Sequence, residues 1–524
     1  MQLSKKPCHF LLQRDGGSIN HLFDMKGACR VLTIIPTTAM FEKQMEILVV
    51  PVCEDADIHP ADFIPELIQQ VKHLKEFKGA EGDQVVFFAP RGICADQIMF
   101  VGLGKKEKTD GESFRKACGK AIKKCIEKEI TDATFAVPFF GAIDIDPEAT
   151  LEAMVEGAYL GNFQFVRFKK PKHPSVQNIH FAVADNLVEQ LRVAAEKTRI
   201  VCDGTLLARE WVNTPSNLKR PEAFAKLLVH LAEKENLKTD VLELPELKKR
   251  NFGALLAVAA GSDAGARLVV LEHCPANASQ TIALIGKGVT FDSGGINLKP
   301  QGSLEDMKMD MAGAAAVAAT LITAARLQMP IRLIGVLPLA ENMPSGSATR
   351  PGDIVESFSG KTIEINNTDA EGRLILADAL SYVIQTYQPH VIADMATLTG
   401  ACMVALGEKI AGIFATDAKL SEGIVAAGLK TYERCWQMPL PEDYKEMLKS
   451  EAADICNITG SKWGGAITAA LFLSEFAGST PWIHIDIAGP AYAKKENAYC
   501  GAGGTGFGVR LLCHWIAKMV ESDV

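Results

Sequence analysis

Short apolar runs alternate with amphipathic stretches along almost the whole chain, and this alternation constrains the fold more than any other feature. In the first third, residues 46–52, 85–90 and 97–104 are apolar runs that contain or end in Pro or Gly. Between them and the next such run, apolar residues of 111–128 recur at helical spacing, with lysines on the other face. Such alternation predicts an α/β fold, in which helices flank a mostly parallel or mixed sheet.

The length of the chain predicts more than one domain. At 524 residues it exceeds a prior of roughly 150 residues per domain. Residues 186–212 have helical spacing with few breakers, and a segment rich in Pro and Asn follows. We therefore predict an N-terminal α/β domain (1–185), a connecting helix (186–212) and a C-terminal catalytic domain (213–524), each domain with its own flanked sheet.

The second half repeats the alternation with stronger strands. The expected strands are 281–286, 331–339, 390–398, 409–416 and 482–489, and the expected helices are 311–327, 374–387 and 418–434. The longest uncharged run, Met311 to Ala325, falls short of the roughly 20 residues that span a bilayer. We interpret it as a buried core helix and expect no membrane association.

Composition excludes several classes of protein. The chain is 48% hydrophobic and 23% charged, as in folded globular proteins, and its net charge of -8 argues against a broad nucleic-acid-binding face. Its 13 cysteines contain no CxxC pair, which favours a reducing compartment over a disulfide framework. The apolar stretch within residues 1–17 is too short for a signal peptide. We expect a cytoplasmic protein.

Two segments concentrate charged residues where strands should end. One follows strand 281–286 and holds Lys287, Asp292, Lys299 and Asp310; the other follows KTIEI and holds Asp369, Glu371 and Arg373. Ligands of open α/β sheets bind outside the carboxyl ends of the strands, so we expect both segments at the same edge of one sheet. If 369–373 is extended, its three charged side chains face one side and converge.

Four acids brought together are unfavourable without cations, because like charges resist being held close. A pair of divalent metals resolves this conflict, as in two-metal aminopeptidases and phosphatases. Any one of these residues alone is usually a solvated turn residue, but their combination favours a metal site. The glycines match neither a P-loop nor a dinucleotide fingerprint.

Several strings of the second half resemble the cytosolic leucyl aminopeptidases, a family of two-metal exopeptidases. They are NTDAEGRL (367–374), GKGVTFDSGGINLKP, MKMDMAGAAAV, VNTPSN (212–217), ATLTGA (396–401) and DIAG (486–489). The resemblance covers most of the second domain. Over the first domain it is only architectural.

The resemblance implies a metal-ligand set. Asp292, Asp369 and Glu371 would bind one metal, together with the main-chain carbonyl of Asp369. The other metal would be bound by Lys287, Asp292, Asp310 and Glu371. A lysine ligand must be neutral, and only an adjacent dication depresses its pKa far enough from roughly 10.4. Mn or Zn are the expected metals, and Mg and Co also suit such ligands.

The resemblance also implies catalytic roles. A water bridging both metals would attack the scissile carbonyl, while Lys299 would bind substrate and stabilise the oxyanion. Arg373, where a helix should begin, would hold bicarbonate as a proton shuttle. The first side chain of the peptide would enter a pocket formed by Met307, Thr397, Gly400, Ala488 and Ala491.

This apolar pocket implies a preference for N-terminal Leu or Met. The family often has a larger residue where Ala491 stands, so the pocket is expected to be roomier. A homohexamer of two stacked trimers is expected from the same resemblance. Two alternatives stay open at this point: a two-metal phosphoesterase, which has less support because the motif region has no histidine, and a DNA-binding or scaffolding role.

Overall fold

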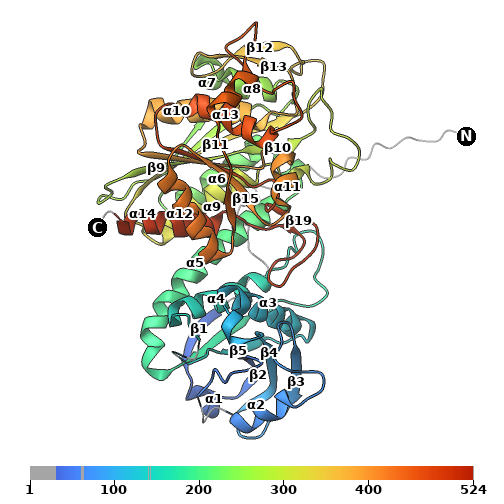
Figure 1. The fold of residues 1–524 in the computed structure, drawn as a ribbon, viewed down its shortest axis with the longest axis vertical. Coiled ribbons are helices and arrows are strands. Elements are labelled where there is room, and N and C mark those ends of the chain that lie inside the picture. Colours follow the sequence, from blue (N-terminus) through green and yellow to red (C-terminus); the bar gives the residue numbers. More distant parts are fainter. Residues whose placement is uncertain (1–30, 61–63, 140, 142, 523–524) are drawn as a thin grey trace, which may run out of the picture.

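The computed structural model describes residues 31–60, 64–139, 141 and 143–522. The prediction that residues 1–17 do not form a signal peptide concerns residues outside this part. The chain forms two lobes, the first drawn in blue and the second in green to red (Figure 1). The long helix α5 (Val188–Asn213) runs between them. The predicted architecture of two α/β domains is confirmed.

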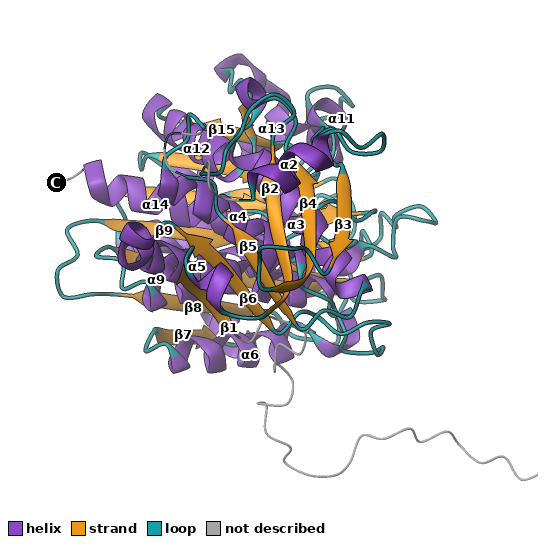
Figure 2. Ribbon diagram, turned by 90° about the horizontal axis from the view of Figure 1, so that it is seen from below, coloured by secondary structure: helices purple, strands orange, loops and turns teal. Residues whose placement is uncertain are grey.

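The first lobe contains a six-stranded sheet of order β1-β6-β5-β2-β4-β3. Neighbouring strands are parallel except for β3 and β4, which pair antiparallel, and Figure 2 shows β2, β4 and β3 side by side. The prediction of a mostly parallel or mixed sheet is therefore confirmed for the first lobe. Its elements are β1 (Val31–Pro36), α1 (Ala39–Glu42), β2 (Met45–Val52), α2 (Pro65–Lys72), β3 (Gln84–Phe88), β4 (Ala95–Gly102), α3 (Gly111–Glu127), β5 (Asp132–Ala136), α4 (Pro147–Gly161) and β6 (Asn178–Val183).

Helix α5 connects the lobes through buried contacts. The guanidinium of Arg209, near its C-terminal end, donates to the carbonyl of Leu160 in the first lobe and to those of Tyr499 and Thr505 in the second. Because these backbone acceptors belong to both lobes, one buried side chain fixes both lobes to the helix.

The second lobe contains a nine-stranded mixed sheet, whose main path is β16-β15-β18-β14-β9-β11-β8-β7 with β10 paired to β11. Its strands are β7 (Lys238–Leu242), β8 (Arg267–His273), β9 (Thr281–Gly286), β10 (Gly288–Asp292), β11 (Arg332–Asn342), β14 (Val391–Ala396), β15 (Ala411–Ala415), β16 (Cys435–Gln437) and β18 (Trp482–Asp486). The flanking helices are α6 (Pro221–Lys234), α7 (Leu244–Lys249), α8 (Gly253–Ala259), α9 (Ala312–Arg326), α10 (Gly372–Tyr387), α11 (Gly400–Leu406), α12 (Ala418–Thr431), α13 (Gly465–Ala477) and α14 (Val509–Ser522).

Helix α9 is a core helix. The segment Met307–Arg326 is long and apolar enough to cross a membrane, but 89% of its most apolar window is buried inside the protein. Its small alanine side chains let the helix pack closely against β9 and β11. These alanines belong to the largest hydrophobic cluster among the described residues. The prediction of a buried helix from the uncharged run is therefore confirmed.

One prediction about strand placement is wrong. The strand KTIEI, β13 (Thr362–Ile365), does not join the main sheet; it pairs with β12 (Asp353–Glu356) and β17 (Ile455–Cys456) in a separate three-stranded sheet. Strand order depends on long-range pairing, which local composition does not encode. The two charged segments therefore reach the same place from two different sheets.

Candidate metal centre

The first charged segment begins where two strands of the main sheet end. Lys287 lies between β9 and β10, and its backbone N–H donates to Met395 of β14. Asp292 is the last residue of β10. Both side chains are almost completely buried. A Cβ atom on Gly372 would lie 2.8 Å from the Lys287 Nζ atom, so a larger residue there would displace the lysine side chain.

The charged side chains of both segments form one cluster. The Lys287 ammonium lies 2.8 Å from Asp310 Oδ1 and 2.7 Å from Glu371 Oε1. The Lys299 ammonium lies 2.8 Å from Asp292 Oδ2 and 2.6 Å from Asp369 Oδ1. The predicted convergence of these residues is therefore present.

The local conformation that brings Asp369 and Glu371 together differs from the expected one. Residues 367–370 form a turn, in which the backbone N–H of Asp369 donates to Asn367 Oδ1 at 2.8 Å, and Glu371 immediately precedes helix α10. The prediction of an extended 369–373 segment is therefore wrong. An Asn side chain that accepts from the backbone two residues on stabilises a turn instead of a strand.

Hydrogen bonds hold the two segments together. Asn297, in the first segment, exchanges two bonds of 2.9 Å with Thr368: its backbone N–H donates to Thr368 Oγ1, and its Oδ1 accepts from the backbone N–H of Thr368. The Thr368 hydroxyl donates to the carbonyl of Gly294 at 2.6 Å. This pairing brings the second segment to the main sheet, although its own strand lies elsewhere.

Burial and the neighbouring ammonium groups shift the pKa values of the clustered carboxyl groups in opposite directions. Burial, with a further contribution from the negative charge of Glu371, raises the pKa of Asp292 to about 6. Burial also raises the pKa of Asp310 well above its usual range. Burial opposes ionisation of Glu371 as well, but the ammonium groups of Lys287 and Lys299 outweigh it and hold its pKa below the usual value.

The cluster fits divalent metal ions. Four carboxylates face two ammonium groups, so two negative charges lack a cation when all are ionised. Asp292, Asp369 and Glu371 each offer an oxygen within 4.8 Å of the other two. Among the described residues, the buried Asp310 Oδ2 has no hydrogen-bond donor. Hard oxygen ligands with unsatisfied negative charge are what divalent ions require.

Arg373 lies on the first turn of α10, next to the cluster. Its Nη1 donates to the carbonyl of Asn457 at 2.8 Å, whereas its buried Nε atom has no hydrogen-bond acceptor among the described residues. Burial lowers the pKa of Arg373 to about 10, although Glu371 and Asp486 oppose the shift. The side chain therefore stays cationic at neutral pH and retains a donor for an anion.

Of the residues expected to line the substrate pocket, Thr397 contacts the charged cluster. Thr397 is buried, and its hydroxyl donates to Asp310 Oδ1 at 2.6 Å while its carbonyl accepts from Lys287. Met307 packs against the hydrophobic cluster that contains Ala491. Ala488 is buried, and Gly400 is exposed at the start of α11.

Two asparagines of the site were missed by the sequence analysis. Asn342 donates to Asp292 Oδ1 and to the carbonyl of Thr368. Asn457 donates to the carbonyl of Asn367 and accepts from the backbone N–H of Asn366. Asn342 ends a buried strand of the main sheet, so the rule that selected Lys287 also selects it. Asn457 follows a two-residue strand that carries no such signal.

Segments from two sheets bring together four carboxylates, two lysines and an arginine, a set of groups that suits a metal-dependent hydrolase. Comparison with known families agrees: residues 206–513 match the catalytic domain of the cytosol aminopeptidase family, and residues 49–172 match the N-terminal domain of the same family. The chain belongs to the cytosol aminopeptidase family.

Similar proteins support this membership over most of the chain. The probable cytosol aminopeptidase of Syntrophotalea carbinolica is 43% identical over 444 residues, covering 84% of this chain and 89% of that protein. The probable cytosol aminopeptidase of Chlorobium phaeobacteroides is 38% identical and covers 93% of this chain and 99% of that protein. The solved structure of the bottromycin maturation enzyme BotP in complex with Mn is 33% identical, with a TM-score of 0.82 over 91% of this chain and 100% of that chain.

The protein is thus a metal-dependent aminopeptidase, which hydrolyses the N-terminal residue from peptides and uses two divalent metal ions. The alternative of a two-metal phosphoesterase is set aside by the family. The alternative of a DNA-binding or scaffolding role gains no support from the comparisons.

Proposed function

We propose that Asp292, Asp369 and Glu371 bind one metal, with the Asp369 carbonyl, and that Lys287, Asp292, Asp310 and Glu371 bind the other. The mutual proximity of the three carboxylates, together with the unpartnered Asp310 Oδ2, carries this assignment. When bound, such ions supply Lewis acidity and a bound water of lowered pKa. The amine of Lys287 must lose its proton to join the ligand set.

Lys299 and Arg373 act on the substrate without binding metal. The Lys299 ammonium shares Asp292 and Asp369 with the proposed metal site, which keeps a positive charge beside the carbonyl to be attacked and stabilises the oxyanion. Arg373 would hold bicarbonate, which would supply a proton carrier, since the proposed ligands include no histidine. The free Nε donor of this buried guanidinium supports an anion site.

The substrate is a peptide whose first side chain is Leu or Met. The pocket consists of Met307, Thr397, Gly400, Ala488 and Ala491, with Lys299 at the scissile bond. The apolar environment of Met307 and Ala491 supports this preference. The small side chain of Ala491 leaves room for larger residues.

Mn or Zn are the proposed metals, and the Mn complex of the related BotP structure supports Mn. The proposed assembly is a homohexamer, and the proposed location is the cytoplasm, in keeping with the name of the family. We divide the chain into domains at 1–185 and 213–524, with 186–212 as connecting helix; α5 at Val188–Asn213 supports this division.

The most informative experiment pairs metal analysis with a panel of amino-acid anilides, before and after chelation. We expect about two metal ions per chain, the highest kcat/KM for Leu and Met anilides, and loss of activity on chelation that Mn²⁺ restores. Activity that survives complete metal removal would contradict the proposal. A substrate order led by charged residues would overturn the pocket assignment alone.

A further inference from the structure

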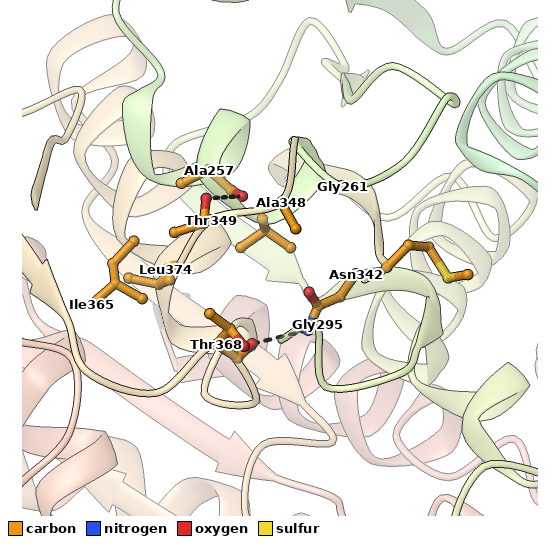
Figure 3. Close-up of a pocket in the computed structure, with 11 residues that line it drawn as sticks. Ala257, Gly261, Gly295, Asn342, Ala348, Thr349, Ile365, Thr368 and Leu374 are labelled. Carbon is orange, nitrogen blue, oxygen red and sulfur yellow. Dashed lines mark hydrogen bonds between the residues drawn. The ribbon is translucent and has the colours of Figure 1, made fainter. Parts of the chain in front are cut away.

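Asn342 occupies a junction between the two ligand-bearing segments. It ends β11 and lies opposite Asp292 in the parallel pairing of β10 with β11. Its side chain is buried, with a relative exposure of 4%. The Nδ2 group donates to Asp292 Oδ1 at 2.9 Å and to the carbonyl of Thr368, the residue before Asp369, also at 2.9 Å. Figure 3 shows Asn342 and Thr368 facing each other across the bond that joins them.

These bonds determine which oxygen of Asp292 is available. Asp292 Oδ1 accepts from Asn342 Nδ2 and from the backbone N–H of Gly294, both at 2.9 Å. Oδ2 is the oxygen that contacts Lys299 within the charged cluster. Two donors on Oδ1 therefore fix the carboxylate rotamer, and Oδ2 is left to face the cluster.

The amide group suits this junction, whereas other groups of the same shape do not. Both neighbours of Nδ2 are acceptors, so the side chain must present two N–H donors to them, and an amide offers these without adding charge. An aspartate would place an oxygen against the same two acceptors. The backbone carbonyl of Asn342 is also in use, since it accepts from the N–H and the hydroxyl of Ser293.

We propose that Asn342 is a positioning residue of the metal centre, which fixes Asp292 and the segment carrying Asp369 and Glu371 in one relative geometry. The inference rests on the proposed ligand set. Hydrogen-bond partners of metal ligands are typically worth 10- to 100-fold in metal affinity or activity. Asn342 touches two ligand segments at once, and its loss is expected to weaken metal binding within that range.

The same cavity supplies a matched control. Thr349 also lines the cavity of Figure 3, and its hydroxyl donates to the carbonyl of Ala257 at 2.7 Å. In T349V a partly buried hydrogen bond is lost at nearly constant shape, and that bond joins neither ligand segment. N342D likewise keeps the shape but removes the donor, whereas N342A removes both. A space-filling role for Asn342 predicts that N342A is impaired and N342D is not.

The experiment measures Mn²⁺ binding to the metal-free full-length protein by equilibrium dialysis, together with kcat and KM for Leu anilide at saturating Mn²⁺. We expect the Mn²⁺ dissociation constant to rise about 10- to 100-fold in both N342A and N342D and to stay within about twofold in T349V. KM is expected to stay within about twofold while kcat falls, because the pocket is unchanged.

The outcomes separate this inference from the proposal on which it rests. N342D that binds Mn²⁺ as tightly as the wild-type protein overturns the role of Asn342 alone, and this variant carries the test if N342A does not fold. A wild-type protein that binds neither Mn²⁺ nor Zn²⁺ would remove the ligand set and the inference with it. An equal loss of affinity in T349V would assign the effect to the cavity and not to the amide, and would also overturn the inference.

Discussion

Two clusters of buried charge in this molecule differ in how their charge is balanced. At the contact between the lobes, Glu156 forms ion pairs with Arg115 and with Arg510, Arg115 also pairs with Glu112, and Arg510 also pairs with Glu433. Glu433 further accepts two backbone N–H bonds, from Gly508 and Leu511. In the metal centre, four carboxylates have only two ammonium groups as partners.

The comparison shows how a buried structural cluster differs from a buried functional one. In the interlobe cluster every carboxylate has a partner within the chain: two guanidinium groups, the Tyr499 hydroxyl on Glu112, and the backbone donors on Glu433. This cluster therefore needs no ligand. The metal centre leaves negative charge uncompensated in a buried place. A folded chain tolerates this only if protons or metal ions provide the missing positive charge.

The largest effect is expected from Glu371→Ala, which removes a carboxylate shared by both proposed metal sites. Without it the metals lose a common ligand, so kcat/KM for Leu anilide should fall by about 10⁴-fold or more, beyond the loss typical of a single catalytic donor. The measurements are metal content after dialysis and steady-state kinetics. Full activity with two bound ions would show that the carboxylate of Glu371 is not a metal ligand.

The structural role of the interlobe cluster is tested by Glu156→Gln, which leaves two buried guanidinium groups without their shared carboxylate. Breaking a buried ion pair in this way costs about 3–5 kcal/mol, and the free energy of unfolding should fall by that amount. Denaturant unfolding measures the loss. Metal content should stay at the wild-type value, and a variant that loses metal at unchanged stability would contradict the structural interpretation.

Lys299→Ala distinguishes the two lysines within the metal centre. We expect the variant to keep both metals and to lose about 10²- to 10³-fold in kcat, the usual range for removing one oxyanion donor. Metal analysis and kinetics on the same sample decide the matter. Loss of metal together with turnover would place Lys299 among the groups that build the site.

A buried carboxyl outside both clusters gives an effect that is small per pH unit. Asp378 accepts N–H bonds from Leu255 and Phe358, and burial raises its pKa to about 7 despite these bonds. Because the folded state holds this proton more tightly than the unfolded chain, stability should fall as pH rises from about 4 to 7, by at most about 1.4 kcal/mol per pH unit. Asp378→Asn should flatten this slope in unfolding experiments between pH 4 and 8. An identical slope in both proteins would exclude Asp378 as its source.

The sequence predicted which charged residues come together better than it predicted the turns and strands that bring them together. Lys287, Asp292 and Asp310 were selected because their segment follows a buried strand of the main sheet, and for this segment the rule holds. The prediction that 369–373 is extended was wrong, because the turn at Asn367 overrides the strand pattern. The separate sheet of β13 and the cross-links made by Asn342 and Asn457 join residues far apart in sequence, and no local pattern reports such contacts.

The chain by itself determined the α/β class, the two-lobed organisation and the kind of chemistry, because apolar periodicity and residue types are local properties. Only the tertiary structure decided that two different sheets deliver the carboxylates, that a turn aims Asp369 and Glu371, and that amide groups fix their spacing. The reason is physical: a charge imbalance arises only when folding removes water and brings distant groups within a few ångströms of one another.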